Sequence, residues 1–455
     1  MHRRYFLKQL ALALGSPAVS AAARESDAGI GPLKSDAGRK LDLPDGYRYT
    51  IVSSAGTPMS DGLRVPHAHD GMAAFPGEDG RVILVCNHEI GPGHFDRSAF
   101  AGAPAPAMKA IQARIYDAGN GKTPGAGGTT TTVFDPRSGR TERQHLSLAG
   151  TESNCAGGPT PWGSWLSCEE CFASPGYRLN SGRLVQREKS HGYVFEVSAY
   201  DEGLVAPVPI RAMGRFEHEA AAVHAPSGIV YMTEDKHHSL FYRYLPNVPG
   251  RLHEGGRLQA LAIVDQPSFS THNWSQMTAM VPGQAFTTRW IDLDDVDPES
   301  DDLRLRGADK GAATFARGEG LCSAAGDLIF SCTIGGAARL GQLFSYQPSP
   351  KEGTAEESEM PGQLTLIAEA SQDSILRNAD NLTFAPWGDL IVCEDTSDHC
   401  GLVGVRPDGS QYALADNPYT NSELAGVCFA PDGKTLFVNI QYPGTTLAIT
   451  GPFPT

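Results

Sequence analysis

Several short apolar strands in this sequence end in acidic residues, and one of them also carries a thiol. In residues 164–170 the apolar pair Trp165-Leu166 is followed by Cys168-Glu169-Glu170. Buried carboxylates are costly unless they are paired with a cation or bind a metal. A strand that delivers a thiol and two carboxylates together therefore indicates a metal site rather than a packed core.

The same outline recurs along the chain. Each copy has an acidic or amide residue, a short apolar strand, a Gly/Pro turn and a second strand that usually ends in an acid or an amide. The copies span residues 69–89, 150–170, 218–235, 317–332, 380–395 and 423–439. Repeated hairpins separated by insertions are typical of β-propellers. The sequence therefore predicts an all-β fold, a six-bladed β-propeller with inter-blade insertions; a large β-sandwich is the alternative.

The innermost strand of each propeller blade lines a central channel, so equivalent residues of distant repeats would meet on one axis. The residues expected there are Glu89, Cys168, Glu169, Glu170, Glu219, Glu234, Glu319, Asp380, Asn381 and Glu394. Oxygen ligands in this number suit Ca²⁺ or Mg²⁺, and one thiolate beside carboxylates suits a transition metal such as iron. The sequence thus predicts a channel that binds several metal ions.

Other residues bear on the substrate and on the rim of the channel. We interpret Cys155 as a packing residue, and we expect His237 and His238 at a blade edge or a pocket rim. Arg317 precedes Glu319 by two residues, so both side chains would face the same side of an extended strand. A guanidinium beside a metal cluster is suited to binding a phosphate through two hydrogen bonds. Arg317 therefore points to a phosphate-containing substrate.

Composition and charge narrow the class of protein. The 455 residues include 51 glycines and 32 prolines, which suits short strands joined by turns, and the formal net charge is −15. This charge argues against a nucleic-acid partner, because proteins that bind nucleic acids present a basic face. The chain has nine cysteines, an odd number, so at least one is unpaired unless a disulfide forms between chains.

The first residues have the pattern of an export signal. Arg3-Arg4 is followed by Phe6-Leu7-Lys8, a modestly apolar run over residues 9–19 and small residues at 20–23. The apolar run is too short to span a membrane. We therefore expect a twin-arginine signal peptide over 1–23, a flexible linker over 24–40 and a single β-propeller catalytic domain over 41–455. The twin-arginine export machinery would make the protein periplasmic or secreted, without stable membrane insertion.

The motifs together resemble those of the PhoX family of twin-arginine-exported bacterial alkaline phosphatases, over nearly the whole mature chain. The matching segments are Asn87-His88-Glu89, residues 150–170, Gly214-Arg215-Phe216-x-His218-Glu219, residues 231–235, Arg317-x-Glu319-Gly320 and Asp380-Asn381-Leu382. The resemblance implies a six-bladed propeller whose channel holds two ferric ions and three calcium ions. It also implies hydrolysis of phosphate monoesters at alkaline pH, and we expect a monomer.

The resemblance further implies roles for individual residues. Cys168, Glu219 and Glu319 match the positions assigned to iron, and Arg317 matches the arginine that clamps phosphate. Arg317, Glu319 and Cys168 are therefore the expected catalytic residues. The positions that fall mainly to calcium are Glu89, Asn154, Glu169, Glu170, Asp380, Asn381 and Glu394. The chain is also shorter than the larger secreted members of the family, so loops at the channel mouth are expected to be trimmed.

Two other functions fit parts of the pattern. One is a calcium-dependent lactonase on a similar propeller, which would need one or two hard cations. The other is a non-catalytic propeller that binds a partner and uses calcium only to stabilise its channel. Neither function has a use for Cys168 or Arg317, so the thiol and the guanidinium favour the phosphatase.

Overall fold

A computed structural model describes residues 30–454, apart from 179–181, 183, 276–278, 325 and 398–399. The expected signal peptide, residues 1–23, lies outside the described residues. In the described part of the expected linker, β1 (Leu33–Lys34) pairs with β2 (Leu43–Pro44). The Asp36 carboxylate there accepts a hydrogen bond from the Tyr49 hydroxyl at 2.6 Å. The domain boundaries remain a prediction.

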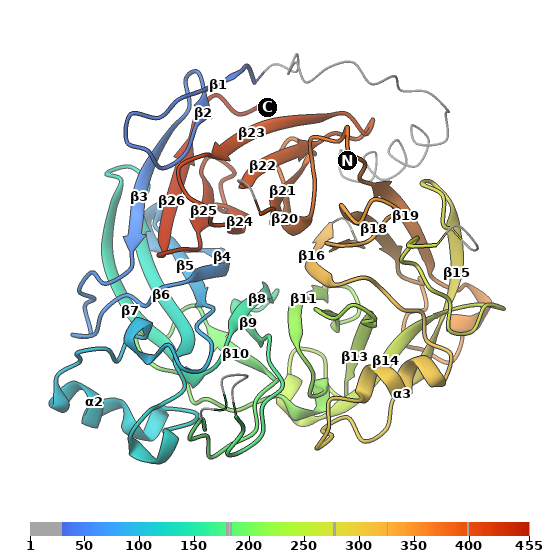
Figure 1. The fold of residues 1–455 in the computed structure, drawn as a ribbon, viewed down its shortest axis with the longest axis horizontal. Helices are drawn as coiled ribbons and strands as arrows, with labels where there is room; N and C mark the ends of the chain where they lie inside the picture. Colours follow the sequence, from blue (N-terminus) through green and yellow to red (C-terminus); the bar gives the residue numbers. More distant parts are fainter. Residues whose placement is uncertain are drawn as a thin grey trace.

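The fold is all-β, and its antiparallel sheets follow one another around a centre in chain order (Figure 1). The first large sheet contains β4 (His69–Pro76), β5 (Val82–His88), β6 (Gly127–Asp135) and β7 (Arg140–Thr151). The next contains β8 (Asn154–Pro159), β9 (Ser164–Glu169) and β10 (Val194–Ser198). Both run outward from the centre as simple antiparallel meanders.

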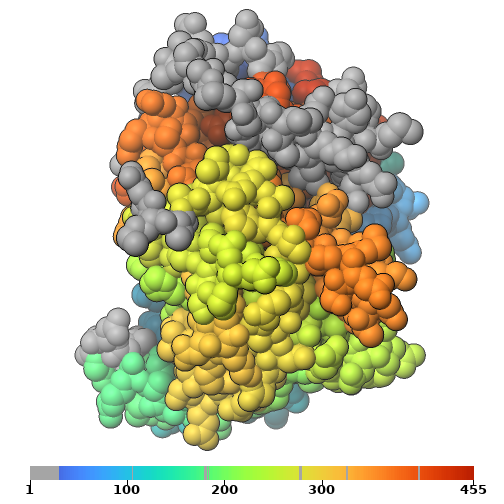
Figure 2. Space-filling model, turned by 90° about the vertical axis from the view of Figure 1, so that its right-hand side faces the viewer, coloured from blue at the N-terminus to red at the C-terminus, as the bar shows by residue number. Residues whose placement is uncertain are grey.

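A nine-stranded sheet follows, and it consists of two meanders joined at their outer edges. The first meander is β11 (His218–His224), β12 (Ile229–Glu234), β13 (Tyr242–Pro246) and β14 (Gly256–Ile263). The second is β16 (Gly318–Ala324), β17 (Asp327–Cys332), β18 (Gln342–Gln347) and β19 (Gln363–Glu369). Strand β15 (Ala285–Asp292) pairs with β14 through residues 288–292 and with β19 through residues 285–287. Figure 2 shows the yellow β15 region and α3 covering much of this flank.

Two further sheets complete the ring. One contains β20 (Ala379–Phe384), β21 (Leu390–Glu394), β22 (Cys400–Val405) and β23 (Gln411–Asn417). The other contains β24 (Leu424–Phe429), β25 (Leu436–Ile440), β26 (Thr445–Thr450) and β3 (Arg48–Ser54). Because β3 comes from the start of the domain and pairs with β26 at its end, backbone hydrogen bonds close the ring.

Helices are short and lie in the connections. The α-helices are α2 (Ala105–Ile111) and α3 (Leu303–Asp309). Single 3₁₀ turns are η1 (Glu78–Gly80), η2 (Phe95–Arg97), η3 (Gln112–Arg114), η4 (Gly119–Gly121), η5 (Arg211–Met213), η6 (Leu252–Glu254) and η8 (Glu357–Glu359). Within the described ranges, none of the helices has the length and apolar character needed to cross a membrane.

The inner edge of the ring is formed by the first strand of each meander, and we call β4, β8, β11, β16, β20 and β24 the channel strands. Residues from all of them line one cavity of about 700 Å³. The hydrophobic core lies between successive sheets. Its largest cluster joins residues of β8 and β9 to those of β11–β14 and β16–β19. The all-β, propeller-like arrangement predicted from the sequence is therefore confirmed.

Candidate metal centre

Each channel strand has a β-bulge near its beginning. On β4, His69 pairs with His88 and Met72 with Cys86, so two residues of β4 lie opposite one residue of β5. The other channel strands show the same shift, between 154 and 157, 218 and 221, 318 and 321, 379 and 382, and 425 and 428. A bulge re-aims the side chain that it leaves unpaired, and bulges are common beside active sites.

The first residue of nearly every bulge has a side chain that binds metals. In chain order these residues are Asp70, Cys155, Glu219, Glu319, Asp380 and Gly426. All six are buried, and Gly426 alone has no side chain that could bind a metal. Since the channel strands surround one axis, the bulges direct four carboxylates and one thiol to the same end of the channel.

These side chains form three groups in which the ligand atoms lie within 4.8 Å of one another. The groups are Cys155-Glu170-Glu219, Glu219-Glu319-Asp380 and Asp70-Glu89-Glu423. The first two share Glu219, so they form one continuous set of ligand atoms. Each group contains at least one bulged residue.

A second set of acids comes from the residues that directly follow the second strand in four of the six meanders. Glu89, Glu170, Asp235 and Asp395 follow β5, β9, β12 and β21. Burial, followed by the charges of Asp395 and Asp235, raises the pKa of Glu89 to about 7. Burial and the charges of Glu89, Asp235 and Glu319 raise the pKa of Glu170. The second set therefore lies beside the bulged residues.

Three of the second strands, β9, β12 and β21, also end in an acid, and that acid faces a loop instead. Both oxygens of the Glu169 carboxylate are occupied by donors: the backbone N–H groups of Glu152, Gly192 and Tyr193, and Nδ1 of His191 at 2.6 Å. Burial lowers the pKa of His191, but the carboxylates of Glu169, Asp117 and Glu152 together outweigh it and raise that pKa to about 10. Glu169 therefore anchors the loop at 190–193.

Glu234 and Glu394 have the same kind of surroundings. Glu234 accepts hydrogen bonds from the Leu240 N–H at 3.2 Å and the Tyr242 hydroxyl at 2.8 Å. Glu394 accepts them from the N–H groups of Arg377 at 2.9 Å and Gly401 at 3.3 Å. Because side chains alternate along a strand, a shift of one residue turns a carboxylate from the channel to the loop. The structure brings Glu89 and Glu170 into the groups but not Glu169, Glu234 or Glu394.

Cys168 lies on β9 opposite the bulge that contains Cys155. On neighbouring sheets this position holds hydrogen-bond donors that reach the next channel strand. The Thr233 hydroxyl donates to the Glu319 carbonyl at 2.6 Å, and the Ser331 hydroxyl donates to the Asp380 carbonyl at 2.8 Å. Cys168 is fully buried and belongs to none of the three groups found among the described residues. The thiol that the structure places with two carboxylates is that of Cys155.

The two predicted asparagines bind protein atoms close to the groups. Asn154 accepts a hydrogen bond from the Thr151 hydroxyl at 2.6 Å and donates to the Ser167 hydroxyl at 2.9 Å. The side chain of Asn381 accepts from the Gly426 N–H at 2.7 Å and donates to the Asp380 carboxylate at 3.0 Å. Asn381 thus links two channel strands and fixes one of the bulged acids.

Arg317 lies immediately before β16, at the entrance to the acid groups. Its Nε and Nη2 bind the two oxygens of Asp235 at 2.7 and 2.8 Å, and Nη2 also reaches Glu319 at 2.8 Å. Within the described part of the chain, Nη1 has no hydrogen-bonding acceptor. The guanidinium is therefore held in place by two carboxylates while one of its nitrogens remains available.

The donor set fits multivalent cations. Burial is the largest cause that raises the pKa of Asp70, Glu170, Glu219, Glu319 and Glu423, and repulsion between neighbouring carboxylates adds to it. So many carboxylates cannot ionise together unless cations lie among them. Oxygen ligands with a single thiol suit hard cations together with one transition metal. The residues present thus agree with a multi-metal site.

Sequence reasoning missed Asp70, Cys155, Asp235, Asp395 and Glu423. Asp235 and Asp395 are each the second residue of an acidic pair, and the presence of two adjacent acids at these strand ends could have indicated them as site residues. Asp70 is the first bulged residue of the first repeat, and Glu423 directly precedes β24. For Cys155 the usable signal was its alignment with Asp70, Glu219, Glu319 and Asp380 in the repeats.

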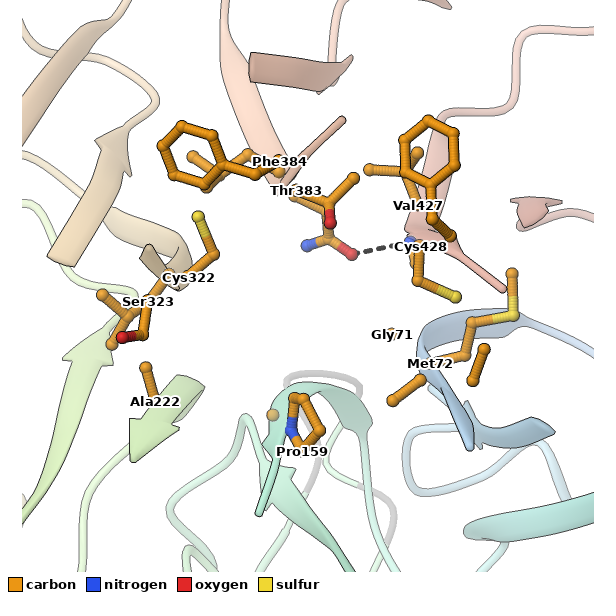
Figure 3. A pocket seen from close by; sticks show the side chains of 18 of the residues that line it. Gly71, Met72, Pro159, Ala222, Cys322, Ser323, Thr383, Phe384, Val427 and Cys428 are labelled. Carbon is orange, nitrogen blue, oxygen red and sulfur yellow. Dashed lines mark hydrogen bonds between the residues drawn. The ribbon is translucent and has the colours of Figure 1, made fainter. Parts of the chain in front are cut away.

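Beyond the bulges the channel is narrow and then opens into the 700 Å³ cavity. A Cβ on Gly320 would lie 2.5 Å from the Asp380 carbonyl oxygen, and one on Gly71 would lie 2.5 Å from Cα of Ala156, so the channel strands are in backbone contact. The cavity beyond is lined mainly by small and apolar side chains, among them Met72, Pro159, Ala222, Cys322, Phe384, Val427 and Cys428 (Figure 3). The three groups of possible metal ligands found among the described residues therefore lie at the other end of the channel.

Comparison with solved structures gives a strong match. Pseudomonas fluorescens PhoX, in complex with the transition-state analogue vanadate, matches with a TM-score of 0.66 and 18% sequence identity, over 91% of this chain and 96% of that chain. A gluconolactonase from Xanthomonas campestris has a TM-score of 0.42 and 12% identity, over 94% and 99%. A virginiamycin B lyase from Staphylococcus aureus, crystallised with quinupristin, has a TM-score of 0.37 and 9% identity, over 89% and 99%.

The sequence comparisons agree with the first of these structures. No curated protein matches the sequence. The family model described as alkaline phosphatase PhoX matches residues 28–444, which include all the channel strands and every acid described above. The chain therefore belongs to the alkaline phosphatase PhoX family.

Proposed function

We propose that this protein is an exported, metal-dependent alkaline phosphatase that hydrolyses phosphate monoesters at an iron–calcium cluster in the channel. The observation that carries the proposal is the convergence of bulged acids, one thiol and Arg317 at one end of the channel, in a chain of the PhoX family. A guanidinium that keeps a donor available beside a multivalent site is suited to a phosphate group.

The proposed ligands are the three groups described above. Cys155, Glu170 and Glu219 supply the thiol-containing end, and Glu319 and Asp380 continue it. We assign two ferric ions near Cys155, Glu219 and Glu319, and three calcium ions among the remaining carboxylates. When bound, these cations would neutralise the phosphate oxygens and lower the pKa of an attacking water molecule.

The chain's own contribution to the reaction centres on Arg317. Asp235 binds the guanidinium through two hydrogen bonds and so fixes its plane. Nη1 would then donate to a phosphate oxygen and hold the phosphoryl group in line for displacement. No covalent nucleophile of the chain is needed in this scheme.

The finer architectural proposal is a six-bladed propeller. The six channel strands that line one cavity, and the bulge that each carries at the same place, support this count. Strand β15 pairs with β14 and with β19 through different residues, which supports reading the nine-stranded sheet as two blades. A monomer that is exported by the twin-arginine machinery and is periplasmic or secreted completes the proposal.

The deciding experiment compares Cys155→Ser with Cys168→Ser. We expect Cys155→Ser to lower bound iron and phosphomonoesterase activity together, by about tenfold or more, because it removes a ligand. Cys168→Ser should retain both, since Ser331 fills the equivalent position on β17. Elemental analysis of each purified variant, followed by assays with a phosphate monoester at alkaline pH, measures the two effects.

The same experiment tests the rival functions. A lactonase or a calcium-stabilised binding protein would contain calcium without iron, and Cys155→Ser would leave its metal content unchanged. If only Cys168→Ser loses iron, the thiol that binds iron is that of Cys168 and not that of Cys155. An iron-containing protein without phosphatase activity would contradict the proposed reaction but not the metal site.

A further inference from the structure

Five residues outside the acid groups form a cluster beside Arg317, and we call His237, His238, His272, Trp274 and Arg339 the rim cluster. Two backbone hydrogen bonds fix its place. The Arg317 N–H donates to the Lys236 carbonyl at 2.9 Å, and the Arg317 carbonyl accepts from the Thr333 N–H at 3.0 Å. His237 follows Lys236 in the chain, and Ile334 follows Thr333.

The indole of Trp274 ties the cluster to this same place. Its N–H donates to the Ile334 carbonyl at 2.7 Å, and the His272 carbonyl accepts from the Gly336 N–H at 2.9 Å. The cluster thus lies one residue from both backbone partners of Arg317. A phosphate held by Arg317 would have the rim cluster at its side.

The rim cluster offers π-electron surface and positive charge. Ring centroids are 4.4 Å apart for His272 and Trp274, 4.8 Å for His238 and His272, and 5.5 Å for His238 and Trp274. The Arg339 guanidinium lies 4.5 Å above the Trp274 ring. His237, His238 and Arg339 are exposed and Trp274 is half-buried. Such surfaces stack on planar, π-rich groups.

One buried polar atom in the cluster has no partner. His272 is 3% exposed, and its Nε2 has no hydrogen-bond partner among the described residues. Burial and the neighbouring His238 lower the pKa of His272 to about 4, so the ring is neutral at physiological pH, and it hydrogen-bonds the Phe315 backbone through its other nitrogen. A neutral imidazole keeps one nitrogen as an acceptor. The exposed His238 ring lies beside the His272 ring.

We propose that the rim cluster binds the leaving group of the phosphate ester, and that its preferred leaving group is a nucleoside whose base carries an amino group. The base would stack on the exposed rings, and its amino group would donate to Nε2 of His272. A buried acceptor that gains its missing donor favours such a ligand over one without a donor. This inference rests on the proposed phosphatase function, because that function places the phosphate at Arg317.

An aliphatic alcohol would gain little from this surface. Glycerol has no π face to stack on the rings, and its hydroxyl groups are already hydrogen-bonded to water before binding. The rim cluster should therefore discriminate between phosphate esters by the alcohol that they release. Arg317 and the acid groups should bind the phosphate group of a nucleoside ester and of a glycerol ester equally well.

Two measurements on the metal-loaded mature protein test the inference. The first is calorimetric titration with adenosine, which requires no hydrolysis. The second is the ratio of kcat/KM for 5′-AMP to that for glycerol 3-phosphate. The variants are His238→Ala, whose side chain is exposed, and Trp274→Ala, with Trp274→Phe as its conservative partner. The matched control is Trp162→Ala, in the turn between β8 and β9, also an indole with an exposed face.

We expect adenosine to bind the wild type and Trp162→Ala equally. Trp274→Ala and His238→Ala should weaken adenosine binding and lower the kcat/KM ratio by about tenfold, the typical effect of losing one base-stacking side chain. Trp274→Phe should recover most of the loss. Absence of adenosine binding, or a ratio that none of the variants changes, would overturn the proposal. If the wild type hydrolyses neither ester, the proposed function fails, and the adenosine titration alone still decides the subsite.

Discussion

Glu234 and Asp235 are neighbours in the chain with opposite surroundings. Asp235 binds Arg317 through two hydrogen bonds, whereas Glu234 faces the strand after it and accepts from Leu240 and Tyr242. Burial raises the pKa of Glu234 to about 8, and within the part of the chain that the structure describes its Oε1 accepts no hydrogen bond and has only the Arg304 guanidinium nearby, at 3.8 Å. At the scale of single residues, the two carboxyl groups therefore have separable roles.

Asp235→Asn and Glu234→Gln form a matched pair that tests this separation. Asp235→Asn removes one charged partner of the Arg317 guanidinium, so we expect kcat/KM for phosphate monoesters to fall about 10–100-fold. Glu234→Gln keeps the shape of a side chain whose neutral form burial already favours, so kcat/KM should stay within about twofold. Steady-state kinetics on both purified variants is the measurement. Equal losses in the two variants would contradict the assignment.

The sequence alone could not predict which member of each acidic pair faces the channel. The acidic pairs 169–170, 234–235 and 394–395 are visible, but which member faces the channel depends on strand register, and register changes at each bulge. Cys155 and Cys168 pose the same problem, because the alignment of bulges that distinguishes them needs the pairing partners. The repeats themselves were readable because turn residues and apolar strands carry a local signal.

At the scale of elements, the bulges work only because the channel strands approach so closely. A Cβ atom at position 320 would lie 2.5 Å from the Asp380 carbonyl oxygen, so only glycine fits there. Gly320 directly follows the bulged acid Glu319, and Asp380 is itself a bulged acid. Any side chain at 320 would push β16 away from β20 and separate Glu319 from Asp380.

Gly320→Ala should therefore lower stability and metal content together. Forcing a methyl group into a packed site costs about 1–3 kcal/mol. Gly203→Ala is the control, because a Cβ there meets no atom within 4 Å, and its effect should stay within about 0.5 kcal/mol. Denaturant unfolding and elemental analysis measure the two quantities. A stable Gly320→Ala protein with full metal content would contradict the close-approach argument.

At the scale of the whole molecule, the acid end of the channel makes stability depend on metal and pH jointly. Burial comes first among the causes that raise the pKa of Glu89 from 4.5 to about 7 and that of Asp380 from 3.8 to about 7 in the metal-free protein. A carboxyl group with a raised pKa binds its proton more tightly in the folded state. Its ionisation therefore costs folding free energy as the pH rises from the unfolded to the folded pKa.

Removal of metal ions with a chelator should destabilise the protein more at pH 8 than at pH 5.5. For Glu89 alone the loss between about pH 4.5 and pH 7 is on the order of 3 kcal/mol, because one pKa unit corresponds to about 1.4 kcal/mol. The metal-loaded protein should show the opposite trend, since cations bind the ionised carboxylates. Thermal unfolding of both forms across this pH range is the test; parallel curves would rule out a dominant role for the acid groups.

The pairing of β3 with β26 also determines when the ring can form. Arg48 lies opposite Thr450, so the last sheet receives one strand from each end of the domain. During synthesis β3 leaves the ribosome first and has no partner until nearly the whole chain has followed. Contacts between residues so distant in sequence form slowly, and unpaired strand edges promote association between chains. A ribosome that stops before β26 would therefore release a chain with two open edges, and translation of β26 becomes the step that commits the ring to closure.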